Sequence, residues 1–560
     1  MRGILALLIW GQGAFAAAPV YDWVLRGAEV IDGSGSPRRK ADVAILADRI
    51  AATGAIPAGS GRQEIAASGL ILAPGFIDML GQSDFSLLLD PRAASKVYMG
   101  VTTEVTGEGG TAAPLSEAQA KQLQEAFAPK GLEINWRSFG QYLKRMEDSR
   151  PAINFASYVG ASQLREIAVG WENRAATPEQ QAQMEKMAAE ALSEGAWGVS
   201  SALQYTPARF ASPEELIGLA RVAERAGGIY ATHQRSEGDA QEASLDEVFA
   251  VAEKAKVPVE IFHLKSAYAR NWGKLPRWIR KIEKAQKRGL KVFANIYPYS
   301  AAATGLTACL PPWLLEGGIG KTIERLSDPA QRARAAEEIG LRSKTWENFY
   351  AGSGGADGVL ISAVQNEALK PLVGKRLAAI AKERGRPAVE VLLDLIVEDR
   401  GRTSAIYFVM SEDDVRAAIK TPWITFGTDS SGRATDGPLA EDRGHPRAWG
   451  TFARILGKYV REEKLITLEQ AIRRMTSLPA ERVGLVSRGL VRPGYFADLA
   501  VFDAKEILDR ATYENPQQYA VGMHYVFVNG QPVLSKGELV AARPGQVLRR
   551  EKLPKVRPRK

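Results

Sequence analysis

The sequence predicts an α/β fold, a distorted (β/α)8 TIM-type barrel with a small β-sandwich domain formed by both chain termini. At 560 residues the chain is too long for one small core and fits a large barrel with a satellite domain. Strand-like and helical segments alternate through its middle, which favours a parallel sheet or barrel. Short strand-like segments occur again at both ends, where they can pair with each other.

Eight apolar, strand-like runs follow one another through the middle of the chain, and a closed barrel needs eight such strands. Helices are predicted between several of them, at 178–194, 213–226, 244–256 and 276–288. Residues 305–415 are too long for one crossover and are expected to form an insertion. In order, the runs end at Asp78, near Thr103, and at Tyr158, Ser200, His233, His263, Ile296 and Asp429.

The terminal segments carry the composition of short strands separated by Gly and Pro. Residues 22–73 and 497–540 both have this pattern, and the Asn529-Gly530 pair predicts a hairpin turn. We therefore expect 19–73 and 481–548 to form the small β domain. The barrel would span 74–480, with its insertion at about 305–415.

The first 18 residues are typical of a secretory signal peptide. Arg2 supplies a positive start, 4–10 are apolar, and 14–18 are mostly alanine, as at a cleavage site. This pattern predicts a periplasmic or secreted protein, with an uncleaved membrane anchor as the alternative. Elsewhere the sequence predicts no transmembrane segment.

Charge and cysteine content limit the partners and cofactors. The net charge is +9, but 549–560 hold seven Lys and Arg against one Glu, so the body is nearly neutral and no nucleic-acid partner is expected. The basic tail could contact anionic lipid or polysaccharide, or be solvated. Cys309 is the only cysteine, which excludes an intrachain disulfide and a zinc cluster of thiolates.

Three polar residues stand at the ends of strand-like runs, where the active sites of parallel barrels form. They are His233, His263 and Asp429. Two imidazoles can hold a divalent metal, and a nearby carboxylate can accept a proton from metal-bound water. Lys265 lies two residues after His263, so both side chains point to one face of a strand and the ammonium could pair with a substrate carboxylate.

At these residues the chain resembles the N-acyl-D-amino-acid deacylase (D-aminoacylase) family of the amidohydrolase superfamily, over residues 22–540. The resemblance implies a metal-dependent barrel with a small β domain that hydrolyses the amide between an acyl group and a D-amino acid. The matching segments are Ala73-Pro-Gly-Phe-Ile-Asp78, Gly100-Val-Thr-Thr103, Ala231-Thr-His-Gln-Arg-Ser-Glu-Gly238, His263-Leu-Lys265, Tyr297-Pro-Tyr299, Gly427-Thr-Asp429, His445-Pro-Arg447 with Gly450-Thr-Phe452, and Met475-Thr-Ser-Leu-Pro-Ala480.

The resemblance also implies roles for single residues. His233 and His263 match the metal ligands and Asp429 the catalytic base. Lys265 and Tyr297 match residues that bind the substrate carboxylate or line its pocket. His445 follows Asp429 on the same barrel face, where it could contact the substrate, support a neighbour or simply pack.

Two departures from the family pattern concern the metal. The superfamily has His-x-His after its first strand, whereas this chain has Leu80-Gly-Gln82, so one metal site is expected to be lost. Where the deacylases often place a metal-binding Cys or carboxylate, the chain has Gly109 beside Glu108. Glu108 is therefore the expected third ligand, with Glu104 as the alternative.

The sequence thus predicts one zinc ion per chain and a small-molecule substrate with a free carboxylate. The expected reaction is hydrolysis of N-acyl-D-amino acids, with Asp429 as the base. The alternatives are a peptidase that acts on D-residue or cell-wall peptides, and a catalytically impaired metal-binding relative. The sequence does not indicate the acyl group, the amino acid or the oligomeric state.

Overall fold

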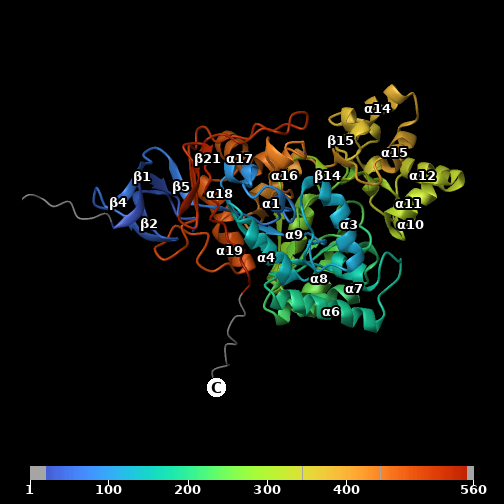
Figure 1. Cartoon of the computed structure of the whole chain (residues 1–560), viewed down its shortest axis with the longest axis horizontal. Helices are drawn as coiled ribbons and strands as arrows, with labels where there is room; N and C mark the ends of the chain where they lie inside the picture. The colour runs from blue at the N-terminus through green and yellow to red at the C-terminus, as the bar shows by residue number, and fades with distance from the viewer. Residues whose placement is uncertain (1–19, 344, 442, 551–560) are drawn as a thin grey trace, which may run out of the picture.

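The computed structural model describes residues 20–343, 345–441 and 443–550, and Figure 1 shows their arrangement. The centre of the molecule consists of parallel strands in two sheets, in the order β6-β7-β8 and β9-β10-β11-β12-β13-β17. Each strand corresponds to one of the eight predicted runs, with β8 and β9 together corresponding to the run that ends at Tyr158. Their bounds are β6 Phe76–Asp78, β7 Val101–Thr106, β8 Asn154–Ser157, β9 Val159–Gly160, β10 Gly198–Ala202, β11 Ile229–His233, β12 Val259–Ile261, β13 Val292–Ile296 and β17 Thr425–Phe426.

Backbone hydrogen bonds join the edges of these two sheets. Between β8 and β9, which are one continuous segment, Tyr158 donates its N–H to the carbonyl of Thr106 at 3.0 Å. Where β17 meets β6, the N–H of Asp429 donates to the carbonyl of Leu80 at 2.7 Å. The strands therefore close into the distorted barrel that the sequence predicts.

The four predicted helices are present, with bounds that differ from the prediction by at most three residues. They are α6 Pro178–Ser193, α7 Pro213–Arg225, α8 Gln241–Ala255 and α9 Leu275–Lys287. Thr177 and Ser212 cap α6 and α7 through capping boxes, and each helix has proline as its first residue. These local signals explain why the starts of α6 and α7 could be predicted from the sequence.

Both ends of the chain contribute to a single nine-stranded sheet. Its order is β21-β20-β19-β18-β5-β1-β2-β3 with β4 paired to β1, so β5 and β18 join the two termini. In Figure 1 the blue N-terminal strands lie beside the red C-terminal ones. The bounds are β1 Tyr21–Val30, β2 Arg39–Leu46, β3 Arg49–Gly54, β4 Gly61–Ala66, β5 Ile71–Pro74, β18 Leu499–Phe502, β19 Met523–Val528, β20 Gln531–Ser535 and β21 Glu538–Leu539.

Two details of this sheet are informative. β1 is one strand of ten residues with a register shift between Leu25 and Ala28, where Gly27 has a φ of 67°. The hairpin turn at Asn529 and Gly530 is confirmed. Their φ angles of 47° and 79° fit a type I′ turn between β19 and β20.

The predicted insertion contains a separate three-stranded antiparallel sheet and a group of helices, coloured yellow to orange in Figure 1. The strands are β14 Ala302–Gly305, β15 Val359–Ala363 and β16 Ser404–Tyr407. The helices include α10 Pro312–Leu315, α11 Gly318–Ser327, α12 Pro329–Gly340, α13 Phe349–Gly352, α14 Leu377–Arg384 and α15 Ala388–Glu398.

The predicted signal peptide lies outside the described residues, as does most of the basic tail. The first two residues of this tail, Arg549 and Arg550, contact the rest of the chain. Arg549 forms an ion pair with Glu147 at 2.8 Å, and Arg550 donates to the carbonyl of Val483 at 3.1 Å. None of the helices within the described ranges is both long and apolar enough to cross a membrane.

Candidate active site

A cavity of about 280 Å³ lies at the carboxyl ends of the barrel strands. Strand ends and the loops that follow them supply most of its lining, and β14 and α13 of the insertion supply the rest. Six of the predicted site residues line it, namely Glu108, His233, His263, Lys265, Tyr297 and Asp429. Gln82, Glu237 and Arg447, which the sequence did not single out for a role, line it as well.

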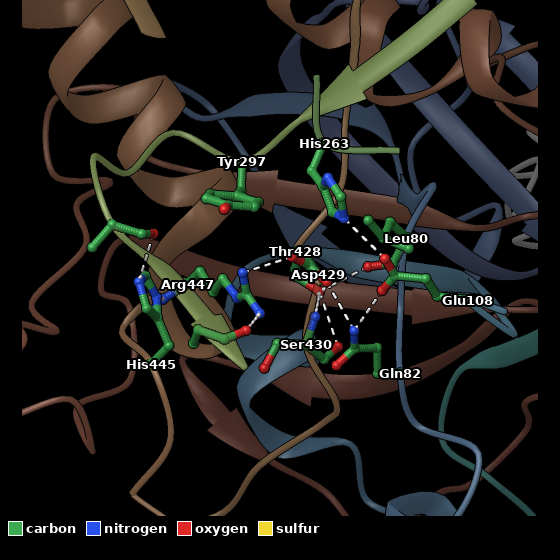
Figure 2. Close-up of polar contacts among 12 residues, drawn as sticks. Leu80, Gln82, Glu108, His263, Tyr297, Thr428, Asp429, Ser430, His445 and Arg447 are labelled. Atoms are coloured by element: carbon green, nitrogen blue, oxygen red, sulfur yellow. Dashed lines mark hydrogen bonds and ion pairs between the residues drawn. The ribbon is translucent and has the colours of Figure 1, made fainter. Parts of the chain in front are cut away.

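The metal-ligand prediction concerns Glu108, His233 and His263, which the structure brings together with donor atoms within 4.8 Å of one another. Glu108 Oε1 lies 3.0 Å from His233 Nδ1 and 2.9 Å from His263 Nε2. Figure 2 shows the contact between Glu108 and His263. Two imidazole nitrogens and a carboxylate oxygen are the ligands of many catalytic zinc sites, so the residues present fit this ion.

The second ring nitrogen of each histidine has its own partner. His233 Nε2 donates to Gln204 Oε1 at 2.8 Å, and His263 Nδ1 lies 2.7 Å from Lys265 Nζ and 2.9 Å from Glu237 Oε1. Because the amide oxygen of Gln204 can only accept, this bond leaves His233 Nδ1, which faces Glu108, with a free lone pair. Metal-binding histidines are commonly fixed in this way. The ring contacts agree with the hydrogen bonds, because the two ring centroids are only 4.4 Å apart.

Glu108 reaches the histidines because of the loop after β7. Gly107 and Gly109 on either side of it have φ angles of 95° and 69°, a conformation that other residues rarely adopt. A Cβ at position 109 would lie 2.4 Å from the Cβ of Ala202. The position that corresponds to the family's cysteine therefore has no room for a side chain, and its neighbour Glu108 faces the site.

Glu104, the alternative ligand, does not line this cavity and makes other contacts. Its carboxylate accepts hydrogen bonds from the backbone and the hydroxyl of Ser83, at 3.1 and 2.8 Å. Lys96 Nζ lies 3.6 Å away, and the Glu104 side chain is fully buried. Burial raises the pKa of Glu104 despite the nearby Lys96 charge.

The positions of the missing His-x-His motif show what replaces it. Leu80 is buried, and Gln82 lies between two carboxylates. Its Nε2 donates to Glu108 Oε2 and to Asp429 Oδ1, at 2.8 Å each, as Figure 2 shows. A neutral amide thus holds together two acidic groups that a second cation could otherwise bridge.

Asp429 follows β17 and has a φ of 49°. Its Oδ2 lies 2.6 Å from Arg447 Nη1. Burial raises the pKa of Asp429 to about 7, since the loss of water and the nearby Glu108 charge outweigh the charge of Arg447. A carboxyl group that titrates near neutral pH can both accept and release a proton.

Arg447 and Glu237 belong to the matching motifs, but no role was predicted for either of them from the sequence. Arg447 begins α17, Arg447–Arg454, and its guanidinium lies 4.8 Å from the ring centre of Tyr297. Its Nε is buried and has no hydrogen-bond partner among the described residues. Glu237 Oε1 accepts from Lys265 Nζ at 2.6 Å. Burial alone would raise the pKa of Glu237, but Lys265 and the two imidazoles lower it.

His445 lies beside Arg447, as Figure 2 shows. Its Nε2 donates to the carbonyl of Ala301 at 3.1 Å, and its Nδ1 accepts the backbone N–H of Arg447 at 2.9 Å. Burial and the Arg447 charge lower its pKa well below the usual range, so the ring is neutral. These contacts position Arg447, and direct contact between His445 and a substrate stays a prediction.

The comparisons with known proteins agree with this site. The sequence profile of the amidohydrolase family matches residues 63–534. The chain belongs to the amidohydrolase family. Two relatives from Alcaligenes xylosoxydans xylosoxydans, an N-acyl-D-glutamate deacylase and a D-aminoacylase, are each 36% identical to it. Both alignments cover 95% of this chain, with 97% and 98% of the relatives.

Among solved structures, this amidohydrolase is again similar to deacylases of N-acyl-D-amino acids. A D-aminoacylase, whose report describes a binuclear metal centre with one-metal activation and second-metal attenuation, superposes with a TM-score of 0.79 at 35% identity. An N-acyl-D-glutamate deacylase from Bordetella bronchiseptica, complexed with zinc and a phosphonate inhibitor, gives 0.78 at 34%. Both cover 95% of this chain and 100% of the relative. The predicted resemblance and fold class are thereby confirmed.

Proposed function

We propose that this enzyme is a zinc-dependent deacylase that hydrolyses N-acyl-D-amino acids to a carboxylic acid and a D-amino acid. The observation that carries the proposal is the convergence of Glu108, His233 and His263 in a buried cavity that also contains Asp429. The named activities of relatives 36% identical over nearly the whole chain support the substrate class.

The chemistry divides between the ion and the protein. Zinc held by Glu108, His233 and His263 would polarise the scissile carbonyl and make a bound water more acidic. Asp429 lies in the same cavity as the zinc ligands, where it can accept the proton of the attacking water and pass it to the leaving amine. Gln82 and Arg447 hold the two Asp429 oxygens in place for this exchange.

The free carboxylate of the substrate requires a cationic partner in the cavity. Lys265 lies there as the sequence predicted, but its ammonium is already paired with Glu237. Arg447 has a buried Nε without a partner among the described residues, so we propose that it binds the carboxylate together with Lys265 and Tyr297.

The proposal is tested with zinc-loaded protein and matched N-acyl-D- and N-acyl-L-amino acids, by measuring release of the free amino acid. We expect turnover of the D series, about one zinc per chain by elemental analysis, and loss of that zinc in His233→Ala. No hydrolysis of any N-acyl amino acid by protein that contains zinc would refute it.

We also propose export to the periplasm or the medium, with removal of a signal peptide. The charged start, short apolar run and alanine-rich segment of 1–18 support this. Mass spectrometry of protein from the cell envelope should give a mature chain that begins near residues 17–19. An intact Met1 on that protein would contradict cleavage.

A further inference from the structure

A second and larger cavity, of about 710 Å³, adjoins the catalytic one. The two share Tyr205 as a wall. The second cavity, which we call the side groove, extends between the loop after β10 and the helices of the insertion. Its apolar walls include Trp171, Leu310, Leu315, Ile319, Ile323 and Trp346.

The loop after β10 connects this groove to the metal ligands. Gln204, which lines the groove, accepts the hydrogen bond from His233 Nε2 at 2.8 Å. The ring centroid of Tyr205 lies 5.1 Å from that of His233. A substrate bound at the metal site therefore has the side groove next to its reacting carbonyl.

Ring contacts indicate which end of a substrate would reach the groove. The rings of Tyr205 and Tyr297 contact different members of the histidine pair: Tyr205 contacts His233, and Tyr297 contacts His263. Tyr297 also packs under the guanidinium of Arg447. If the amino-acid carboxylate binds at Arg447 and Tyr297, the acyl group on the other side of the scissile bond is directed towards Tyr205.

We propose that the side groove binds the acyl group, and that the enzyme prefers apolar acyl chains of medium length to acetyl. This inference rests on the proposed deacylase function and specifies its substrate class. The half-buried side chains of Trp171, Ile319 and Ile323 provide apolar surface that an acetyl group would leave in contact with water.

The charged residues of the groove do not change this assignment. Arg402 Nε donates to the carbonyl of Asp399 at 3.1 Å, and Arg209 donates to the carbonyl of Thr345. Glu347 accepts from Ser236. Backbone or hydroxyl groups thus already engage three of the five charged side chains that line the groove. The other two, Glu125 and Arg400, are exposed to solvent, and the apolar walls remain for the acyl chain.

The inference is tested with acetyl, hexanoyl and decanoyl derivatives of one D-amino acid on the full zinc-loaded chain. Each methylene that becomes buried can raise kcat/KM by up to about fourfold. We expect the hexanoyl substrate to exceed the acetyl one by at least about tenfold. A polyether acyl chain of equal length should lose most of this gain, because it gains little from leaving water.

Substitutions in α11 test whether the side groove causes the preference for longer acyl chains. Ile323→Trp fills the groove, whereas Glu324→Trp places the same side chain on the exposed face of the same helix. We expect Ile323→Trp to abolish the hexanoyl advantage without loss of zinc, and Glu324→Trp to keep both the hexanoyl advantage and the zinc. Trp171→Ala, which removes a groove wall, should weaken the preference independently if Ile323→Trp folds poorly.

The outcomes separate this inference from the proposed function. Absence of turnover with every N-acyl-D-amino acid refutes the function, and the inference with it. Acetyl turnover without a gain for longer chains refutes the inference alone. A stronger gain for acyl chains that end in a carboxylate, or for peptidyl groups of the same length, would also overturn it.

Discussion

Replacement of Asp429 by Asn tests the proposed base and its environment together. Asn has the same size and can still hydrogen-bond to Gln82, but it cannot accept the proton. General-base assistance is typically worth about 10²–10⁴ in rate, so we expect kcat to fall by at least about a hundredfold with zinc retained.

The same substitution should also cost stability. Asp429 and Arg447 form an ion pair at 2.6 Å, and their side chains are only 8% and 6% exposed. Removing the carboxylate leaves Arg447 unpaired, but it also removes the burial cost and the Glu108 repulsion that raise the pKa of Asp429 to about 7. The free energy of unfolding should therefore fall by less than the ~3–5 kcal/mol that is typical of a broken buried pair. Adding Arg447→Met removes the orphaned charge, so the double variant should recover part of this stability but no activity.

The assays are turnover, zinc content and denaturant unfolding on one preparation of each protein. If Asp429 is chiefly a metal ligand, Asp429→Asn will lose zinc in proportion to activity, and added zinc will restore both. Full activity in Asp429→Asn would refute the base and ligand roles alike. A loss of about 3 kcal/mol or more in the stability of Asp429→Asn would contradict this balance between the ion pair and the cost of burial.

Three further predictions concern the ligands. Glu108→Gln should weaken zinc binding by at least about tenfold because an amide is a poor zinc ligand, whereas Glu104→Gln, the matched control, should keep zinc; equal loss in both variants would contradict the assignment. Leu80→His with Gln82→His should raise the metal content above one per chain in elemental analysis, and an unchanged content would show that the lost motif is not what limits it. Gly109→Cys should destabilise the protein by about 1–3 kcal/mol in denaturant unfolding, because a Cβ there would lie 2.4 Å from that of Ala202; wild-type stability together with tighter zinc binding would contradict this.

The barrel and part of the site could be predicted because they depend on local patterns. Apolar runs that end in polar residues mark strand ends, and parallel strands bring those ends to one face. His233 and Asp429 were found in this way although 196 positions separate them in the sequence. The hairpin at Asn529 followed equally directly, from a two-residue turn with known conformational demands.

The rest of the site depends on packing that a single sequence does not display. Arg447 begins a helix, and only the tertiary fold places it against Asp429. Lys265 was predicted as a site residue, but its ion pair with Glu237 was not. The two residues follow different strands, Glu237 after β11 and Lys265 after β12, so the sequence does not show that they meet. The choice between Glu108 and Glu104 depended on the left-handed φ of Gly107, which redirects the chain after β7.

The charges around the cavity explain why one divalent ion suits this site. Among the described residues that line it, three are carboxylates, Glu108, Glu237 and Asp429, and two are cations, Lys265 and Arg447. When both histidines are neutral zinc ligands and all three carboxyl groups are ionised, these side chains carry an excess of one negative charge, and one zinc ion changes it to an excess of one positive charge. An anionic substrate then brings the buried site to neutrality. A second divalent ion would add two uncompensated positive charges to a buried space, where unpaired charge is costly. The neutral amide of Gln82, which joins two of the carboxylates, is consistent with a site built for a single ion.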